Sequence, residues 1–336
     1  MATLSTFRPC PYTSEADFKA IAHLINTCRA ADDIDYRMSV TDVREGLGSP
    51  RFDISRDLRL WRDGSGDLVA LAEFWHTPQP DQTEVLAYAC FDIHPHVRGD
   101  GLESAAITWA EQRLREVGKG LSRPLVLHSS CRDTLTNRRE VLAQFGFIPE
   151  RYFSQLKRSL QETIVIPSIP DGFRVRTVDA HKDADAWVEM FNQSFVDHWN
   201  HSPLTLDDYH YYCSSSDYNP ALDLVLETET GKLVTFCYSR IDAERNERLG
   251  IKEGYVNLLG TRRGYRRQGL ARTLLTTGLQ RLQSMGMETV TIGVDSQNPS
   301  GAVGLYQSVG FAEHLSSTVY RKEVIRIPTP VIQPGS

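Results

Sequence analysis

The chain has 336 residues, which suits two domains of ordinary size and excludes one small domain. Hydrophobic residues make up 40% and charged residues 24% of it, so the composition excludes a disordered chain and predicts a folded one. The 37 Lys and Arg against 43 Asp and Glu residues give a net charge of −6, which does not favour binding to nucleic acid or to an anionic membrane.

The N-terminal segment lacks a basic stretch followed by an apolar run, and no stretch reaches about 18 uninterrupted apolar residues. The six cysteines are scattered, without a C-x-x-C pair or a His/Cys cluster at metal-ligand spacing. We therefore expect a cytoplasmic protein with free thiols and no bound metal.

A weak internal repeat divides the chain into two halves. Three landmarks recur at offsets of 164 to 168 residues: Phe7-Arg8 and Phe173-Arg174, residues 97–102 and 265–270, and Gly146-Phe147 and Gly310-Phe311. This repetition predicts a tandem duplication, with domains at 1–163 and 173–326. Residues 164–172, with two prolines, are the expected linker, and residues 327–336, with three prolines, are the expected flexible tail.

Both halves mix strands and helices in the same order. The first half has a predicted helix through Leu102, Ala106 and Trp109 and a strand at 125–127. The second half has predicted strands at 173–178, 222–226, 233–238, 254–260, 289–294 and 318–320, and helices at 184–195, 269–285 and from about Pro299. The expected fold class is α+β, with a mixed sheet flanked by helices in each of two duplicated domains.

The most informative segment spans residues 258–271, where a strand ends in a basic turn that opens an amphipathic helix. Backbone N–H groups and the positive helix end meet there, and Gly269 allows a ligand to approach the backbone. Arg266 and Arg267 add positive charge. The spacing excludes a dinucleotide fingerprint and a P-loop, so we expect another kind of phosphate site; the alternative is a solvated arginine cluster before an ordinary helix.

This segment resembles the [QR]-x-x-G-x-[GA] pyrophosphate loop of the GNAT superfamily of N-acetyltransferases, through Arg266, Gly269 and Ala271. Downstream, Asn298, Leu305-Tyr306 and Gly310-Phe311 resemble the N…LY…GF signature of that superfamily. The tandem arrangement is similar to that of the mycothiol synthase family. The resemblance implies two GNAT-like domains, of which the first is degenerate and the second is catalytic.

The resemblance also implies acetyl-CoA as co-substrate. The backbone of residues 267–271 would bind its pyrophosphate, the strand at 255–260 would pair with its pantetheine arm, and Asn298 would contact that arm. The residues implied to bind it are Leu259, Gly260, Thr261, Arg266, Arg267, Gln268, Gly269, Leu270, Ala271 and Asn298.

Direct transfer of an acyl group to an amine requires a neutral amine, a donor for the developing oxyanion and a proton for the departing thiolate. Tyr306 stands where the resembled family places its general acid; the alternative is an ordinary core tyrosine. Glu253, at the start of the third strand of the second half, is the candidate base. The family pattern puts a glutamate nearer the position of Tyr255, so a solvated Glu253 is the alternative. A backbone N–H near Leu259 would be the oxyanion donor.

The first half keeps Arg98 and Gly101, but Glu103 stands where the second half has Ala271. A carboxylate in this position would repel a pyrophosphate, and Leu142, in the position of Tyr306, has no proton to give. We expect a degenerate copy that supports the fold or shapes the acceptor site; the alternative is a site for another acyl carrier.

The sequence therefore predicts an acetyl-CoA-dependent N-acetyltransferase that acts on a small-molecule or peptide primary amine. The alternative is a non-enzymatic acyl-CoA-binding or regulatory module. Asp197 and the residues after it either contact the acceptor or form a polar loop. No nucleic-acid or membrane partner is expected, and the protein would be a monomer or homodimer.

Overall fold

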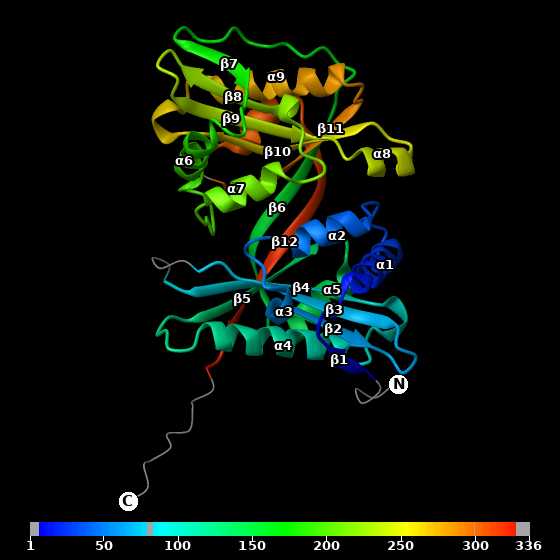
Figure 1. The fold of residues 1–336 in the computed structure, drawn as a ribbon. Coiled ribbons are helices and arrows are strands. Elements are labelled where there is room, and N and C mark those ends of the chain that lie inside the picture. The colour runs from blue at the N-terminus through cyan, green and yellow to red at the C-terminus, as the bar shows by residue number, and fades with distance from the viewer. Residues whose placement is uncertain (1–6, 79–82, 299, 327–336) are drawn as a thin grey trace, which may run out of the picture. The chain divides into compact units, whose positions relative to one another are not determined.

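The computed structural model describes residues 7–78, 83–298 and 300–326. The chain forms two compact units, of which unit 1 comprises Met1–Glu150 and Val319–Ser336 and unit 2 comprises Arg151–Thr318. Each unit is a sheet with helices packed against it (Figure 1). The expected tail at 327–336 lies outside the described residues.

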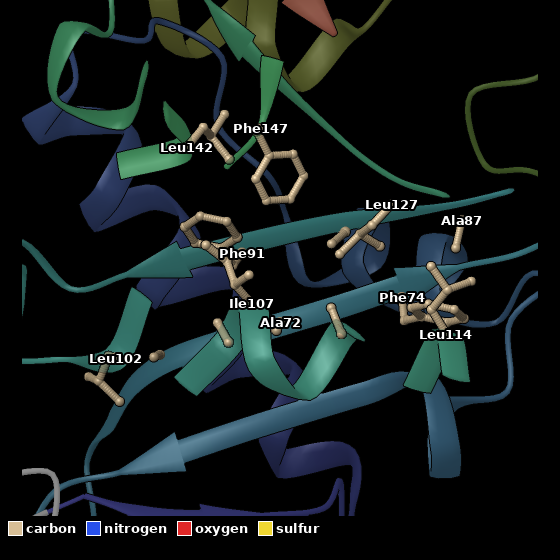
Figure 2. Packing of buried hydrophobic residues seen from close by; sticks show 14 of the residues in the cluster. Ala72, Phe74, Ala87, Phe91, Leu102, Ile107, Leu114, Leu127, Leu142 and Phe147 are labelled. Carbon is tan, nitrogen blue, oxygen red and sulfur yellow. The ribbon is translucent and has the colours of Figure 1, made fainter. Parts of the chain in front are cut away.

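Unit 1 is built on strands in the order β1-β2-β3-β4-β5, with β4 and β5 parallel. One core, shown in Figure 2, packs α4 and α5 against the sheet, and a second packs α1 and α2 against it. Its elements are β1 (Arg8–Cys10), α1 (Glu15–Ala31), α2 (Val40–Leu47), α3 (Ile54–Asp57), β2 (Leu58–Arg62), β3 (Leu68–Trp75), β4 (Val85–Ile93), α4 (Leu102–Val117), β5 (Leu125–Arg132) and α5 (Thr136–Gln144), followed by the start of β6 (Ile148–Ser159).

Unit 2 is built on strands in the order β6-β11-β10-β9-β8-β7, with β10 and β11 parallel. Its elements are β7 (Phe173–Thr177), α6 (Ala184–Phe195), α7 (Leu206–Cys213), β8 (Asp223–Thr228), β9 (Leu233–Arg240), α8 (Ala243–Leu249), β10 (Glu253–Thr261), α9 (Leu270–Ser284), β11 (Thr289–Asp295), α10 (Ala302–Ser308) and β12 (Ala312–Val324). Cores form on both faces of its sheet, one with α9 and α10 and the other with α6 and α7; we call these the α9 face and the α6/α7 face.

Apart from the short helices α3 and α8, the two units repeat one order of strands and helices, which confirms the predicted α+β class and the duplication. The predicted helices at 184–195 and 269–285 correspond to α6 and α9. No sequence pattern predicted α7 or α8. Helix α10 begins at Ala302 rather than near Pro299, which lies outside the described residues.

The compact units do not coincide with the predicted domains 1–163 and 173–326. Residues 151–159 of β6 belong to unit 2, where Leu156 is part of the core. Conversely, residues 319–324 of β12 belong to unit 1, where Tyr320 and Val324 are part of the core. The first half therefore contributes most of its last strand, β6, to unit 2, and the second half contributes the end of its last strand, β12, to unit 1.

Candidate active site

In unit 2, the parallel strands β10 and β11 pair only over their first residues, Glu253–Val256 with Thr289–Ile292. Beyond this point β11 continues alongside β6, and β10 continues alongside β9 after a register shift between Val256 and Leu258. Over residues 257–261, the edge of β10 that faces β11 therefore has no strand partner in the described part of the chain. Backbone polar groups on such an edge are available to an extended ligand.

The turn that follows β10 leads into the N-terminus of α9. Arg267 and Gly269 both have left-handed backbone conformations, with φ of 64° and 81°. Gly269 is the N-cap of α9, and no side chain caps the helix. The first N–H groups of a helix have no intrahelical partner, so they point out of the turn together with the positive end of the helix dipole. This is the geometry of an anion site.

Gly269 is exposed, and a Cβ added there would meet no atom within 4 Å. The space next to the turn is therefore open to a ligand. Gln268 and Arg267 are also exposed, while Leu270 is buried against the α9-face core and Ala271 is half-buried in the first turn of the helix.

The other arginines of this turn act as structural clamps. Arg266 donates from Nε to the Thr261 carbonyl at 3.2 Å, from Nη1 to Asp197 at 2.9 Å and from Nη2 to the Ser194 carbonyl at 2.8 Å. Arg263 also binds Asp197, and hydrogen bonds from Arg263 and Arg266 hold the pKa of that carboxyl well below its usual range. Asp197 thus joins the end of α6 to the loop, which favours the polar-loop alternative over contact with the acceptor.

The remaining residues predicted to bind acetyl-CoA have mixed surroundings. Leu259 packs against the α9-face core, and the Thr261 hydroxyl lies 3.2 Å from that of Thr235. A Cβ at Gly260 would lie 2.5 Å from the Phe236 ring, so packing itself requires glycine there. Asn298 accepts a hydrogen bond from the Ser300 N–H at 2.8 Å, within its own turn.

Tyr306, on α10, shares the α9-face core with Leu259 and Leu270 and is 6% exposed. Burial raises its pKa, and the nearby Cys237 and Tyr255 raise it further. The phenol therefore stays neutral and protonated at working pH, as a proton donor must. The predicted acid is thus brought onto the same face of the sheet as the helix that opens at Gly269.

Glu253 lies at the first residue of β10, four residues before the register shift, or roughly 13 Å along an extended strand. It binds Lys157 Nζ through Oε2 at 2.6 Å and Arg245 Nη1 through Oε1 at 2.9 Å. Burial opposes its ionisation, but these two cations outweigh burial and lower its pKa. Its role as base stays a prediction, and the two ion pairs weigh against it.

Unit 1 reproduces the shape of the loop. Arg98 donates to the Ile93 carbonyl at 3.1 Å and pairs with Asp32 at 2.6 Å, just as Arg266 binds Thr261 and Asp197. Gly101 is the left-handed N-cap of α4, with φ of 95°. Asp32 and Asp197 lie 165 residues apart, so this pair is a further landmark of the repeat that the three predicted landmarks did not include.

The content of the unit 1 loop differs. The Gly99 N–H donates to Glu103 Oε1 at 3.0 Å, so the chain's own carboxylate lies at the turn that would receive an anion. Leu142, in the position of Tyr306, is buried beside Phe147 in the apolar core of Figure 2. That unit 1 is a degenerate copy stays a prediction.

Comparison with known proteins places this fold in a class. Residues 184–311 match the acetyltransferase (GNAT) family. A GCN5-related N-acetyltransferase from Sphaerobacter thermophilus has the same fold, with a TM-score of 0.73, 22% identity and coverage of 97% of this chain and 99% of that one. A tandem GNAT protein from the clavulanic acid biosynthesis pathway has a TM-score of 0.68, 14% identity and coverage of 96% and 100%.

The chain belongs to the acetyltransferase (GNAT) family and is an acetyltransferase. Within the family it is similar to mycothiol acetyltransferases. It is 32% identical over 274 residues to that of Streptomyces coelicolor, covering 79% of each chain. It is 30% identical over 258 residues to that of Thermobispora bispora, covering 76% of this chain and 81% of the relative.

Neither a cluster of metal ligands nor a membrane-spanning helix is found among the described residues. No group of three or more His, Cys, Asp or Glu side chains in 7–78, 83–298 and 300–326 is arranged to hold a metal ion. Within the same ranges, no helix combines the length and apolar character needed to cross a bilayer.

Proposed function

We propose that this acetyltransferase uses acetyl-CoA to acetylate a primary amine, and that unit 2 performs the reaction. The observation that carries the proposal is the combination, in unit 2, of an unpaired edge on β10, an uncapped left-handed turn at Gly269 and a buried Tyr306. In unit 1 the corresponding positions hold Glu103 and Leu142. The similarity to mycothiol acetyltransferases supports a small-molecule amine as acceptor.

The residues of the turn fit the coenzyme by their chemistry. Backbone N–H groups of residues 267–271 would hold the pyrophosphate, and the exposed Arg267 would add positive charge. The free edge of β10 over residues 257–261 would pair with the amide-containing arm of the coenzyme. When bound, acetyl-CoA supplies an activated thioester.

Within this arrangement the chain has two tasks. Backbone N–H groups of the free β10 edge, near Leu259, would stabilise negative charge that develops on the carbonyl oxygen. Tyr306 would give its proton to the departing thiolate. Its raised pKa makes it a weak acid in isolation, but burial raises the proton affinity of a neighbouring thiolate for the same reason.

The test is release of free CoA thiol from acetyl-CoA with a panel of primary amines, with the N-acetyl product identified by mass spectrometry. Acetylation of at least one amine, lost in the Tyr306→Phe variant, is expected. Tight acetyl-CoA binding without turnover on any amine would support the non-enzymatic binding module instead.

A further inference from the structure

A buried carboxylate lies two strands away from the point where β10 and β11 diverge. Asp223, at the start of β8, is opposite Tyr238 of β9, which is opposite Leu258 of β10 next to the register shift. With strands about 4.8 Å apart, Asp223 lies roughly 10 Å from that point in the same row. Leu258 packs against the α6/α7-face core, so this row belongs to the face opposite Tyr306.

Tyrosines fill the space around this row. The Tyr218 hydroxyl donates to Asp223 Oδ2 at 3.0 Å. The rings of Tyr212, Tyr218 and Tyr238 are 5.0 to 5.7 Å apart. The buried Tyr212 hydroxyl lies beside the Asn257 side chain, and burial raises the pKa of Tyr212 well above its ordinary value although Asn257 opposes that rise. The Tyr212 and Tyr218 rings therefore lie between Asn257, which is next to the divergence of the strands, and Asp223.

The pairing of Asp223 distinguishes it from other carboxylates near this face. Glu253 binds Lys157 and Arg245. Asp295 binds Arg151, and Asp217 binds Arg240. In the described chain Asp223 has no ion pair, and its Oδ1 has no hydrogen-bond partner although it is fully buried. A buried carboxylate without a cation holds a proton more readily than a paired one.

The surroundings of Asp223 are otherwise uncharged or acidic. Burial and the nearby Asp183 together raise the pKa of Asp223 to about 7. The hydrogen bond from Tyr218 and the Trp187 indole oppose this rise. One acidic group near Asp223 is Asp183, at the start of α6, and it is paired with Arg176 of β7. The other titratable groups around Asp223 are Tyr209, Tyr212 and Cys213 of α7, Tyr218 of the following loop, and Cys237 and Tyr238 of β9.

We propose that Asp223, acting through the hydroxyl groups of Tyr218 and Tyr212, receives the proton that the acceptor ammonium must lose before it attacks. Asp223 does not touch the acceptor and is therefore a positioning residue. This inference rests on the proposed function, because it assumes that an amine is acetylated where β10 and β11 diverge.

The protons balance over one turnover. An ammonium group loses its first proton to the tyrosine hydroxyls, and Tyr218 passes a proton to Asp223 Oδ2 as it accepts one, so both tyrosines remain neutral. When the new N–C bond forms and the C–S bond breaks, the nitrogen releases a second proton to solvent. The thiolate takes a proton from Tyr306, which is restored from solvent. The net products are the amide, the free thiol and one proton, which Asp223 returns to solvent.

The test is the pH profile of kcat/KM for the full chain, with two accepted amines of different pKa. In the wild type we expect an acid limb near pH 7 that is common to both amines, because it belongs to the enzyme. Asp223→Asn should remove this limb and slow turnover by about 10-fold to 1,000-fold, with unchanged acetyl-CoA affinity. Tyr218→Phe should also slow turnover, because it removes the hydroxyl that donates to Asp223.

Glu227→Gln is the matched control, since Glu227 is a buried carboxylate on the same strand that binds Arg174 and Arg176. It should change stability and leave the acid limb in place. An Asp223→Asn enzyme that keeps the wild-type limb and turns over within about twofold of the wild-type rate would overturn the proposal.

An infrared titration of the coenzyme-free protein separates this proposal from the proposed function. We expect a protonated-carboxyl band that disappears as pH rises through about 7 and is absent in Asp223→Asn. If the band is present and no amine is acetylated, the proposed function is wrong, and the relay fails with it. If amines are acetylated and the band is absent, the relay alone is wrong.

Discussion

The partners of a buried side chain decide its chemistry more than its residue type does. Glu253 and Asp223 are both buried carboxylates at the start of a strand in unit 2. Two cations lower the pKa of Glu253, whereas burial without a cation raises that of Asp223. The sequence predicted that Glu253 lies at the start of a strand. Its ion partners Lys157 and Arg245 come from other elements, and no local pattern shows such contacts.

We predict that Glu253→Gln lowers stability more than activity. The free energy of unfolding should fall by roughly 1–3 kcal/mol because Lys157 and Arg245 lose their shared partner. Since the pKa of Glu253 is lowered by folding, its contribution is present above its ordinary pKa and is lost as pH falls. Thermal melting at pH 7 and steady-state turnover measure the two effects. If turnover slows by about 100-fold or more while melting is unchanged, Glu253 is restored as the base.

For Tyr306→Phe we expect turnover to fall by about 100-fold to 10,000-fold, the usual effect of losing an acid. The acetyl-CoA dissociation constant should barely change, since only a hydroxyl is lost from a packed ring. Steady-state kinetics and calorimetry measure these quantities. Tyr320→Phe, which removes a hydroxyl from a buried tyrosine of unit 1, is the matched control and should keep wild-type turnover. Equal turnover in both variants would make Tyr306 a core residue only.

The raised pKa of Asp223 predicts a gain in stability for Asp223→Asn. Between its ordinary pKa and about 7 the folded state holds a proton that the unfolded state has lost, so this group makes stability fall as pH rises through that window. The asparagine variant should therefore melt several degrees higher than the wild type at pH 8, and the difference should disappear near pH 4. A lower melting temperature at pH 8 would show that the charged form is stabilised by the fold.

At the scale of elements, the N-terminus of α9 depends on backbone conformation. Gly269→Ala should cost about 1 kcal/mol of stability, because any L residue is strained at a φ of 81°. Gly269→Glu should cost a similar amount of stability but abolish acetyl-CoA binding, because it adds a negative charge to the anion site. Melting and calorimetric titration of the two variants separate strain from charge. Acetyl-CoA affinity of Gly269→Glu equal to that of Gly269→Ala would argue against a phosphate site.

Hydrophobic periodicity and turn signals predicted most of the elements of unit 2. The apolar stripe of α9 and the apolar run of β9 match the burial of these elements, so the sequence itself indicates them. By contrast, α8 is AERNERL, with too few apolar residues to form a stripe, and α7 is a short tyrosine-rich helix. The sequence does not show that the tyrosines of α7 lie beside Asp223, because that contact is made between distant elements.

Strand exchange is the feature of the whole molecule that the repeat did not predict. A sequence repeat shows where copies begin, but strand pairing depends on long-range contacts that sequence order does not fix. Residues 151–159 therefore complete unit 2 and residues 319–324 complete unit 1. The repeat also predicts a divergence in function between the two units, because Glu103 and Leu142 replace Ala271 and Tyr306 at matching positions.

This divergence predicts one acetyl-CoA site per chain, despite two loops of the same shape. Glu103 already accepts the Gly99 N–H in unit 1. Removing it with Glu103→Gly should not create a second site, because Asp100 still adds negative charge and Gly99 stands where unit 2 has Arg267.

Calorimetric titration should therefore give one site per chain, of equal affinity, in the wild type and in Glu103→Gly. Gly269→Glu should remove that site. Two equivalent sites in the wild type would contradict the prediction. A second site only in Glu103→Gly would show that a single carboxylate, rather than the combined loss of charge, keeps unit 1 from binding acetyl-CoA.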